Sequence, residues 1–520
     1  MPTLDWIGKD KVVNHHLDVP YRVLERVYSY DQAGQHDADN GSENMIIHGD
    51  NLEALKALLP QYEGRVKCIY IDPPYNTGNE GWVYNDNVND PRMVAWLGKV
   101  VGSEGEDLSR HDKWLCMMYP RLRLLQKLLA EDGVIFISID DIEVTYLRMI
   151  MDEIFGKAHF IAQFIWKSRQ NKDNRNVTHV SIDHEYVLCY GKALKGCSRK
   201  EGQYSNPDND PRGPWTSANM AGLATAEARP NLHYDLINPC TGINYGRPAK
   251  GWRYDRNTMS RLISENRILW PPTPAGRPRK KQFLSELTTE TTGYSSIIGA
   301  EMYTRDGTNE QRLIWDQQVF NFPKYSGFIQ ELLEQATDPD SIILDSFAGS
   351  GTTAHAVLKA NAADGGHRRF ILVELMDYAD TITAERVKRV INGYGEGKSA
   401  VPGIPGDFSF YELGEPLFIG ENLNEDVGID KIRKYVFFTE TRQRIQPSSE
   451  PYYLGSHVGN AYYFYYERDQ VTILNRDFLH GIQTKAENYV IYADQCVFSP
   501  EELERYHVAF KKIPRDISRL

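Results

Sequence analysis

An acid, two prolines and an aromatic residue follow an apolar run, as Asp72, Pro73, Pro74 and Tyr75. A strand interior does not tolerate two prolines, so these residues mark the point where a strand ends. The Asp72 carboxylate and the Pro73 carbonyl are two acceptors, which suit the two N–H groups of an amine. Because proline restricts the backbone, that carbonyl keeps a fixed orientation. Tyr75 adds an aromatic face on which a planar ring can stack.

A glycine-rich loop lies much later in the chain, within ILDSFAGSGTTAHAV. An apolar strand runs into Asp345, Phe347, Gly349 and Gly351, and a helix-favouring segment follows. Glycines there permit a tight turn and close approach of the backbone to a ligand. Glu374 ends the next apolar run, ~20 residues on, where an acid commonly binds ribose hydroxyls. Neither the dinucleotide fingerprint nor a P-loop is present, so the loop predicts an adenosine ligand without phosphates, although a tight turn of any Rossmann-like domain also fits.

The elements that must position these residues follow an α/β pattern. The runs 65–72 and 134–140 are apolar throughout, as in strands buried on both faces of a parallel sheet. A helix that ends at Gly133 is expected over 114–133, between these strands. The periodicity fades from about 193 to 320 and then returns. The pattern predicts an open, mostly parallel α/β sheet that is split in sequence by an insert.

The same pattern predicts how the chain is divided. We expect an N-terminal arm, a first half of the sheet with Asp72, an insert, a second half with the glycine loop, and a β-rich C-terminal region. Their expected bounds are 1–44, 45–192, 193–320, 321–399 and 400–520. Asn51 is expected to cap the helix of the first βα unit. The aromatic run YVFF, residues 435–438, is among those that favour strands in the last region.

Composition narrows the class of protein. The chain has 520 residues, of which 41% are hydrophobic and 25% charged, as in folded proteins. It has no apolar run of ~18 residues that would span a membrane, and no apolar signal core at the N-terminus, so a cytoplasmic protein is expected. Its six cysteines are scattered without a CxxC pair. Neither a metal site nor a disulfide framework is therefore expected.

The two motifs together resemble the amino-methyltransferases of DNA, in which an Asp-Pro-Pro-aromatic loop is catalytic and an FxGxG loop holds S-adenosylmethionine. The order of the motifs, with an insert between them, is similar to the circularly permuted β class. The matching motifs run over 45–192 and 321–390. More narrowly, the chain resembles the Mod subunit of type III restriction–modification systems, in HGDNLEAL, DPPYNTG, HEYVLCYGK, FPK and FKKIPRDI. The resemblance implies a Rossmann-like methyltransferase fold with an inserted target-recognition domain and a β-rich C-terminal region.

The resemblance also implies an activity and a set of site residues. The activity is methyl transfer from S-adenosylmethionine to N6 of an adenine flipped out of double-stranded DNA. Asp72, Pro73, Pro74 and Tyr75 are the expected catalytic residues, and an Asp in first position favours adenine over cytosine. The expected cofactor contacts are Asp50, Asp72, Lys324, Asp345, Phe347, Gly349, Gly351, Thr352 and Glu374. For Asp50 the alternative role is an Asx turn, and for Lys324 the alternative is an ordinary solvated lysine. Trp166 is expected to be a buried core residue.

A basic window interrupts a chain whose net charge is −12. Arginines and lysines dominate between Arg247 and Lys281, with Trp252, Tyr254 and Trp270 interleaved. Arginine suits both phosphate contacts and guanine readout, and the window falls in the insert. The expected DNA contacts are Arg247, Lys250, Arg253, Arg256, Arg277, Arg279 and Lys280. A solvated surface is the alternative, and for a second basic stretch at 167–175 the two are evenly balanced.

The resemblance finally implies partners. Mod subunits form dimers and pair with a Res helicase–nuclease subunit, and residues 400–520 are the expected dimer or partner contact. A stand-alone adenine methyltransferase and a cytosine-N4 methyltransferase are the enzymatic alternatives. A catalytically silent DNA-binding scaffold is the alternative from another class, and the intact motifs argue against it. The missing pyrophosphate loop argues against a dinucleotide oxidoreductase.

Overall fold

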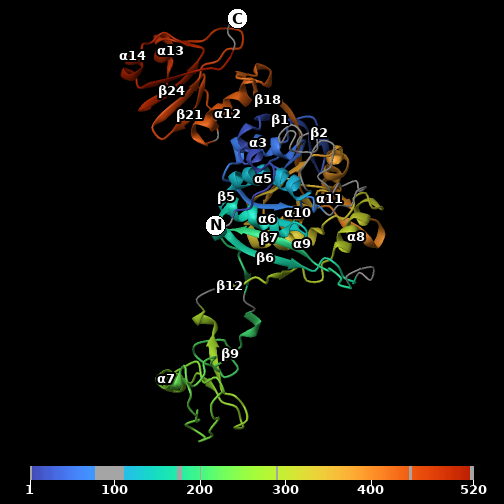
Figure 1. The fold of residues 1–520 in the computed structure, drawn as a ribbon, viewed down its shortest axis with the longest axis vertical. Helices are drawn as coiled ribbons and strands as arrows, with labels where there is room; N and C mark the ends of the chain where they lie inside the picture. Colours follow the sequence, from blue (N-terminus) through green and yellow to red (C-terminus); the bar gives the residue numbers. More distant parts are fainter. Residues whose placement is uncertain are drawn as a thin grey trace. The chain divides into compact units, whose positions relative to one another are not determined.

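The computed structural model describes residues 3–76, 110–172, 179–198, 201–287, 291–443, 445 and 448–515. Figure 1 shows the course of the chain. The chain divides into two compact units. One consists of Met1–Leu194 together with Ser295–Leu520, and the other is Lys195–Tyr294. The second unit is shorter than the expected insert of 193–320, since residues 193–194 and 295–320 belong to the first unit.

The first unit is built on an eleven-stranded sheet of order β13-β6-β7-β5-β4-β14-β15-β3-β18-β1-β2. Neighbouring strands from β5 to β18 run parallel. Their bounds are β5 Leu129–Ile139, β4 Val66–Ile71, β14 Ile342–Asp345, β15 Arg369–Glu374, β3 Met45–His48 and β18 Phe408–Pro416. Cys68 to Ile71 of β4 are all buried, as expected for a strand covered on both faces. The predicted mostly parallel α/β sheet, assembled from both sides of an insert, is confirmed.

Antiparallel strands extend the sheet at both ends. They are β1 Arg22–Asp31 and β2 Gly34–His36 beside β18, and β7 Glu185–Gly191 and β6 Phe160–Trp166 beside β5. The edge strand β13, Ile297–Ile298, pairs with β6 in parallel. The sheet thus takes strands from residues 1–44 and from residues 400–520, which the sequence pattern set apart as an arm and a C-terminal region.

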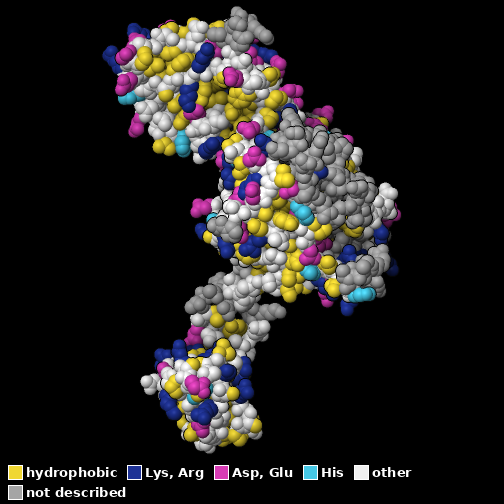
Figure 2. Space-filling model, in the orientation of Figure 1, with side chains coloured by type: hydrophobic (Ala, Val, Ile, Leu, Met, Phe, Trp, Pro, Cys, Tyr) yellow, Lys and Arg dark blue, Asp and Glu magenta, His cyan; other side chains and the backbone are white. Residues whose placement is uncertain are grey.

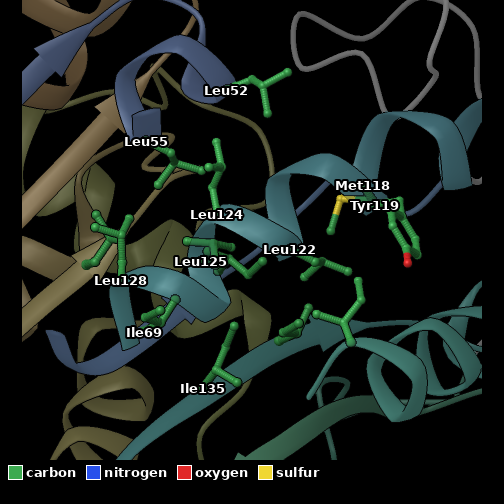
Figure 3. Close-up of a cluster of buried hydrophobic side chains, with 14 of the residues drawn as sticks. Leu52, Leu55, Ile69, Met118, Tyr119, Leu122, Leu124, Leu125, Leu128 and Ile135 are labelled. Carbon is green, nitrogen blue, oxygen red and sulfur yellow. The ribbon is translucent and has the colours of Figure 1, made fainter. Parts of the chain in front are cut away.

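Helices connect and cover the strands. Those nearest the sheet are α3 Asn51–Tyr62, α5 Arg110–Leu128, α6 Val144–Met151, α8 Thr304–Trp315, α9 Ser326–Ala336, α10 Thr352–Asp364 and α11 Glu385–Asn392. Figure 3 shows leucines of α3 and α5, among them Leu55 and Leu125, gathered with Ile69 of β4 and Ile135 of β5. This packing fixes the direction in which β4 delivers the loop that follows it.

Two local predictions about these helices were wrong. The helix expected to reach Gly133 ends at Leu128, because Leu129 already pairs with Val66 of β4. Strand pairing therefore overrides the helical preference of the last turn. The helix α3 is capped by Asp50, whose side chain accepts the Leu52 N–H at 2.7 Å, and not by Asn51.

The C-terminal region combines a helix with a four-stranded sheet. The helix α12, Ile429–Thr441, contains the aromatic run 435–438 that was expected to form a strand. Ile432 and Val436 are buried at helical spacing, so packing of this face outweighs the strand preference of the aromatic residues. The sheet consists of β21 Tyr453–His457, β22 Asn460–Phe464, β24 Asn488–Ala493 and β26 Val508–Lys512.

Short elements complete the first unit. They are α1 Lys9–Val12, α2 His15–Asp18, β16 Gly393–Tyr394, β17 Val401–Pro402, β19 Phe418–Ile419, β20 Asn422–Leu423, β23 Ile473–Leu474, α13 Arg476–Gly481, β25 Gln495–Cys496 and α14 Pro500–Arg505. Within the part of the chain that the structure describes, no helix is long and apolar enough to cross a membrane.

The second unit has its own small core. A three-stranded antiparallel sheet of β10 Ile268–Leu269, β11 Arg279–Phe283 and β9 Trp215–Asn219 accompanies the helix α7 Arg256–Ser264. Met220, Trp252, Met259 and Leu262 are among its buried residues. Two short strands, β8 Cys197–Ser198 and β12 Thr291–Thr292, pair where the chain enters and leaves the unit.

Candidate active site

Two neighbouring parallel strands deliver the two motifs to the same edge of the sheet. β4 and β14 pair through Cys68 with Ile343 and Ile69 with Leu344. The acid-proline loop follows β4 and the glycine loop follows β14. The chain leaves β4 for β5 on one side and β14 for β15 on the other, so the motifs flank a topological switch point. Ligands of open α/β sheets bind at such points.

A cavity of about 660 Å³ opens at this edge of the sheet. Its volume falls within the ~300–1,000 Å³ of typical ligand pockets. Nine of the residues expected to act on substrate or cofactor line it together: Asp72, Pro73, Pro74, Tyr75, Lys324, Asp345, Phe347, Gly349 and Thr352. The cavity lies entirely within the first unit.

Three of the expected cofactor residues lie outside the cavity lining. Asp50 caps α3 and has Arg121 within 3.5 Å. Glu374 accepts the Gly349 N–H at 2.7 Å and so stabilises the glycine loop. Gly351 begins α10 with φ at 77°, and a Cβ there would come within 2.8 Å of the Thr383 carbonyl oxygen. Their contact with a cofactor stays a prediction.

The Asp72 carboxylate faces a buried ammonium group. Lys324 Nζ lies 3.0 Å from Asp72 Oδ1 and donates a hydrogen bond of 2.8 Å to Tyr75 Oη. The same ammonium lies 4.8 Å from the centre of the Tyr75 ring, within cation–π range. Lys324 is therefore a buried part of the site, which contradicts its alternative as a solvated lysine.

The Oδ1 atom of Asp72 is buried, and among the described residues it has the Lys324 ion pair but no hydrogen bond of regular geometry. Burial raises the pKa of Asp72, while the nearby Lys324 lowers it and so opposes the shift. Burial lowers the pKa of Lys324. The carboxylates of Asp72 and Glu185 raise the same pKa by more, so its net shift is upward. The ammonium thus stays charged, and the oxygen beside it is a strong acceptor for an incoming N–H.

The loop that carries Asp72 is held by a tryptophan that the sequence pattern did not single out. Trp114, fully buried on α5, donates its indole N–H to the Pro74 carbonyl at 2.7 Å. Asn76 follows with φ at 60°, the left-handed region that Asn tolerates better than most residues. Thr77 and Gly78, the last residues of the motif, lie outside the described residues.

The glycine loop is held by its own carboxylate. Asp345 accepts the Phe347 N–H at 3.0 Å and a hydrogen bond from the Thr353 hydroxyl. Burial raises the pKa of Asp345 to about 7. A cationic group that entered the cavity beside this carboxyl would favour its ionised form.

Trp166 belongs to the core, as expected. Its ring is fully buried and stacks on Phe328 at a centroid distance of 4.3 Å. Its indole N–H donates to the Met302 carbonyl at 2.7 Å.

The basic residues of the insert differ in exposure. Among the expected DNA contacts, Lys280 is half-buried. The other six are exposed, and they are Arg247, Lys250, Arg253, Arg256, Arg277 and Arg279. Figure 2 shows Lys and Arg side chains on the visible face of this unit. Lys281 is buried instead, and it pairs with Asp208 and, at 3.1 Å, with Asp210. In the second basic stretch, Arg169 lines the cavity, and residues 173–175 lie outside the described residues.

Three acids of the cavity wall were not predicted from the sequence. Glu185 is the first residue of β7, and Asp140 and Asp141 directly follow β5. Because these strands are antiparallel, the start of β7 meets the carboxyl end of β5. Burial raises the pKa of Asp140 to about 6. The one signal in the sequence was an acid at the border of an otherwise apolar run.

Comparison with known proteins gives consistent matches. The family described as DNA methylase matches residues 66–385. The StyLTI Mod subunit of a type III restriction–modification enzyme from Salmonella typhimurium is 31% identical, over 74% of this chain and 62% of that protein. The EcoP15I Mod subunit from Escherichia coli is 29% identical, over 75% and 66%. The chain thus spans less than two thirds of the length of these Mod subunits.

A shorter relative is covered more fully. The type II methyltransferase M.KpnI from Klebsiella pneumoniae is 34% identical, over 65% of this chain and 81% of that protein. Among solved structures, a DNA modification methylase of Thermus thermophilus, complexed with S-adenosyl-L-methionine, is 16% identical. The structural match covers 71% of this chain and 99% of the chain in that structure, with a TM-score of 0.32.

Proposed function

This chain belongs to the DNA methylase family, and we propose that it transfers a methyl group from S-adenosylmethionine to N6 of an adenine in double-stranded DNA. The observation that carries the proposal is the buried Asp72 Oδ1, which forms an ion pair with Lys324 but accepts no hydrogen bond of regular geometry from the described residues. It faces a cavity that it shares with the glycine loop. An exocyclic amine is the kind of group that such an acceptor binds.

The residues of the loop would prepare the amine for attack. The lone pair of an exocyclic adenine amine is delocalised into the ring, which makes the nitrogen a poor nucleophile. Asp72 would accept one N–H and the Pro73 carbonyl the other, which favours a pyramidal nitrogen. Tyr75 would stack on the flipped base, a contact worth ~1–3 kcal/mol. The residues act by orientation, so no covalent enzyme intermediate is required.

The other side of the cavity fits the cofactor. S-adenosylmethionine, when bound, supplies an electrophilic methyl group. Asp345 presents a buried carboxyl group that suits the ammonium of a methionine moiety. Phe347, Gly349 and Thr352 line the same wall, where the tight loop lets a ligand approach the backbone. Asp50, Gly351 and Glu374, which are outside the cavity lining, stay proposed cofactor contacts.

The relatives support the proposal of a type III-like setting. Those named above include Mod subunits of type III restriction–modification enzymes. We therefore propose that this chain is a modification subunit that acts in the cytoplasm, as a homodimer with a Res helicase–nuclease partner. Residues 400–520 are the proposed dimer or partner contact. Co-purification with the product of a neighbouring Res-like reading frame tests the partnership against a stand-alone enzyme.

Methylation-sensitive long-read sequencing tests the activity directly. We expect N6-methyladenine on one strand of a short asymmetric site in DNA from cells that express this chain. The control is DNA from cells that express Asp72→Ala. Detection of N4-methylcytosine alone would show a cytosine enzyme, and DNA binding without any methylation would show a scaffold.

The exposed arginines of the insert are proposed to contact DNA phosphates and bases. Replacing Arg253 and Arg277 by Ala should weaken DNA binding and lower the slope of log affinity against log salt by ~2, because each lost phosphate contact removes ~0.9. Fluorescence anisotropy with a labelled duplex at several salt concentrations measures both quantities.

A matched double variant controls for net charge. Arg505 and Lys512 are exposed basic residues of the C-terminal region. Their replacement by Ala removes the same charge and should leave the slope unchanged. An equal loss in both double variants would show that the insert makes no specific contribution to DNA binding.

A further inference from the structure

Four side chains form a closed polar cluster around the amine-accepting carboxylate. Asp72 and Tyr75 follow β4, Glu185 opens β7, and Lys324 lies just before α9. Tyr75 donates its hydroxyl to Glu185 Oε2 at 2.9 Å, and Lys324 Nζ lies 3.2 Å from the same oxygen. Lys324 Nζ is also 3.0 Å from Asp72 Oδ1. One buried ammonium is thus shared between two carboxylates.

The sharing changes what Asp72 can do. If Lys324 faced Asp72 alone, the full attraction of its charge would fall on the oxygen that must accept an amine N–H. Because Glu185 also attracts the Lys324 ammonium, the ammonium is held less strongly by the Asp72 oxygen. The Tyr75 hydroxyl is also close to Asp72, and Glu185 competes for this donor by accepting its hydrogen bond.

We propose that Glu185 is a positioning residue for the methyl-transfer reaction, which holds Lys324 and Tyr75 so that Asp72 remains a strong acceptor for the target amine. Glu185 acts through these two neighbours and does not touch the amine. This inference rests on the proposed function for its role in catalysis, while the coupling between Glu185 and Asp72 is a property of the protein itself.

The charges that face Asp72 give the direction of the effect. Lys324 lowers the pKa of Asp72 and Glu185 raises it, on top of the larger upward shift from burial. From the neighbouring strand β14, Asp345 also faces Asp72, and Tyr70 of β4 stays neutral because burial raises its pKa well above the usual value. Removing the negative charge of Glu185 must therefore lower the pKa of Asp72.

The test compares Glu185→Gln with the wild-type protein. Gln keeps an oxygen that accepts the Tyr75 hydroxyl but removes the charge. Because the ionised Asp72 is the active form, activity is lost as the pH falls through its pKa. We expect the acid limb of the kcat–pH profile to move down by about one pH unit and kcat to fall, with KM for S-adenosylmethionine nearly unchanged. An acid limb at the wild-type pH would overturn the proposal.

Two further variants fix the interpretation. Lys324→Met removes the opposite charge, so its acid limb should move to higher pH. Glu153→Gln is the matched control, since Glu153 also accepts a tyrosine hydroxyl and pairs with a lysine, through Tyr119 and Lys9, outside the cavity lining. Its profile should equal that of the wild type. If Glu185→Gln does not fold, Glu185→Asp, which retracts the carboxylate by one methylene, should give a smaller downward shift.

A direct titration separates this inference from the proposed function. Carbon-13 labelling of aspartate carboxyl groups reports the ionisation of Asp72 by NMR, with Asp72→Asn to identify its signal. The signal should titrate at lower pH in Glu185→Gln than in the wild type, whether or not the chain methylates DNA. An unchanged titration midpoint would exclude the coupling even in an active enzyme.

Discussion

Asp72→Ala lowers the rate of methyl transfer by ~10²–10³-fold, since it removes a preorganised acceptor from the reacting amine. The binding of S-adenosylmethionine should change less, because Asp72 is only one of the expected cofactor contacts and the glycine-loop wall of the cavity is untouched. Single-turnover transfer of a labelled methyl group measures the chemical step, and calorimetry measures cofactor affinity. A loss confined to cofactor binding would contradict the role proposed for Asp72.

Two variants make this result specific. Asp72→Asn keeps one oxygen acceptor at the same position, so it should retain more activity than Asp72→Ala. Asp132→Ala is the matched control, because Asp132 also pairs with a lysine, Lys67, at 2.6 Å. That pair is on the surface at the amino end of β4 and β5, away from the cavity. Its loss should leave transfer unchanged, so equal effects at the two acids would point to a loss of stability.

The sequence could predict the two halves of the cavity because each is local. A strand that ends in Asp72 and the prolines, and another that ends in Asp345 and the glycines, identify two carboxyl ends. In a parallel sheet these ends share an edge, so the sequence also indicates that the motifs meet if the strands are neighbours. Their direct pairing, β4 beside β14, is a matter of strand order that no local pattern encodes.

The residues that the sequence missed depend on that order. Glu185 reaches Lys324 only because β7 is antiparallel to β5, which puts its first residue at the catalytic edge. Trp114 reaches the Pro74 carbonyl from a helix whose start gives no motif. The error at residues 435–438 has the same origin, since aromatic residues satisfy either a strand or a buried helix face. Tertiary contacts decide each of these cases.

Arg386→Met is expected to have the largest effect on stability. Arg386 is fully buried on α11, and it donates to Thr352 Oγ1 at 2.6 Å and to Ser350 Oγ at 3.0 Å, both at the start of α10. The second terminal nitrogen of Arg386, Nη2, lies 2.7 Å from Glu310 Oε2 of α8. Removing one partner of a buried pair leaves an uncompensated charge, so the free energy of unfolding should fall by ~3–5 kcal/mol. Urea denaturation at neutral pH measures the change.

The pH dependence and a double variant test the cause of that loss. Although burial raises the pKa of Glu310, His355 and Arg386 lower it, and the net shift is downward. The wild type therefore loses this stabilisation as the pH falls through the folded-state pKa of Glu310, below its usual value. Without Arg386 the buried carboxyl is expected to protonate more readily, so the stability gap between wild type and Arg386→Met should narrow from pH 7 toward pH 4.

Adding Glu310→Leu to Arg386→Met removes the orphaned charge, and the double variant should lose less than the sum of the single losses. Additive losses at every pH would mean that Arg386 stabilises the glycine loop through Ser350 and Thr352 alone.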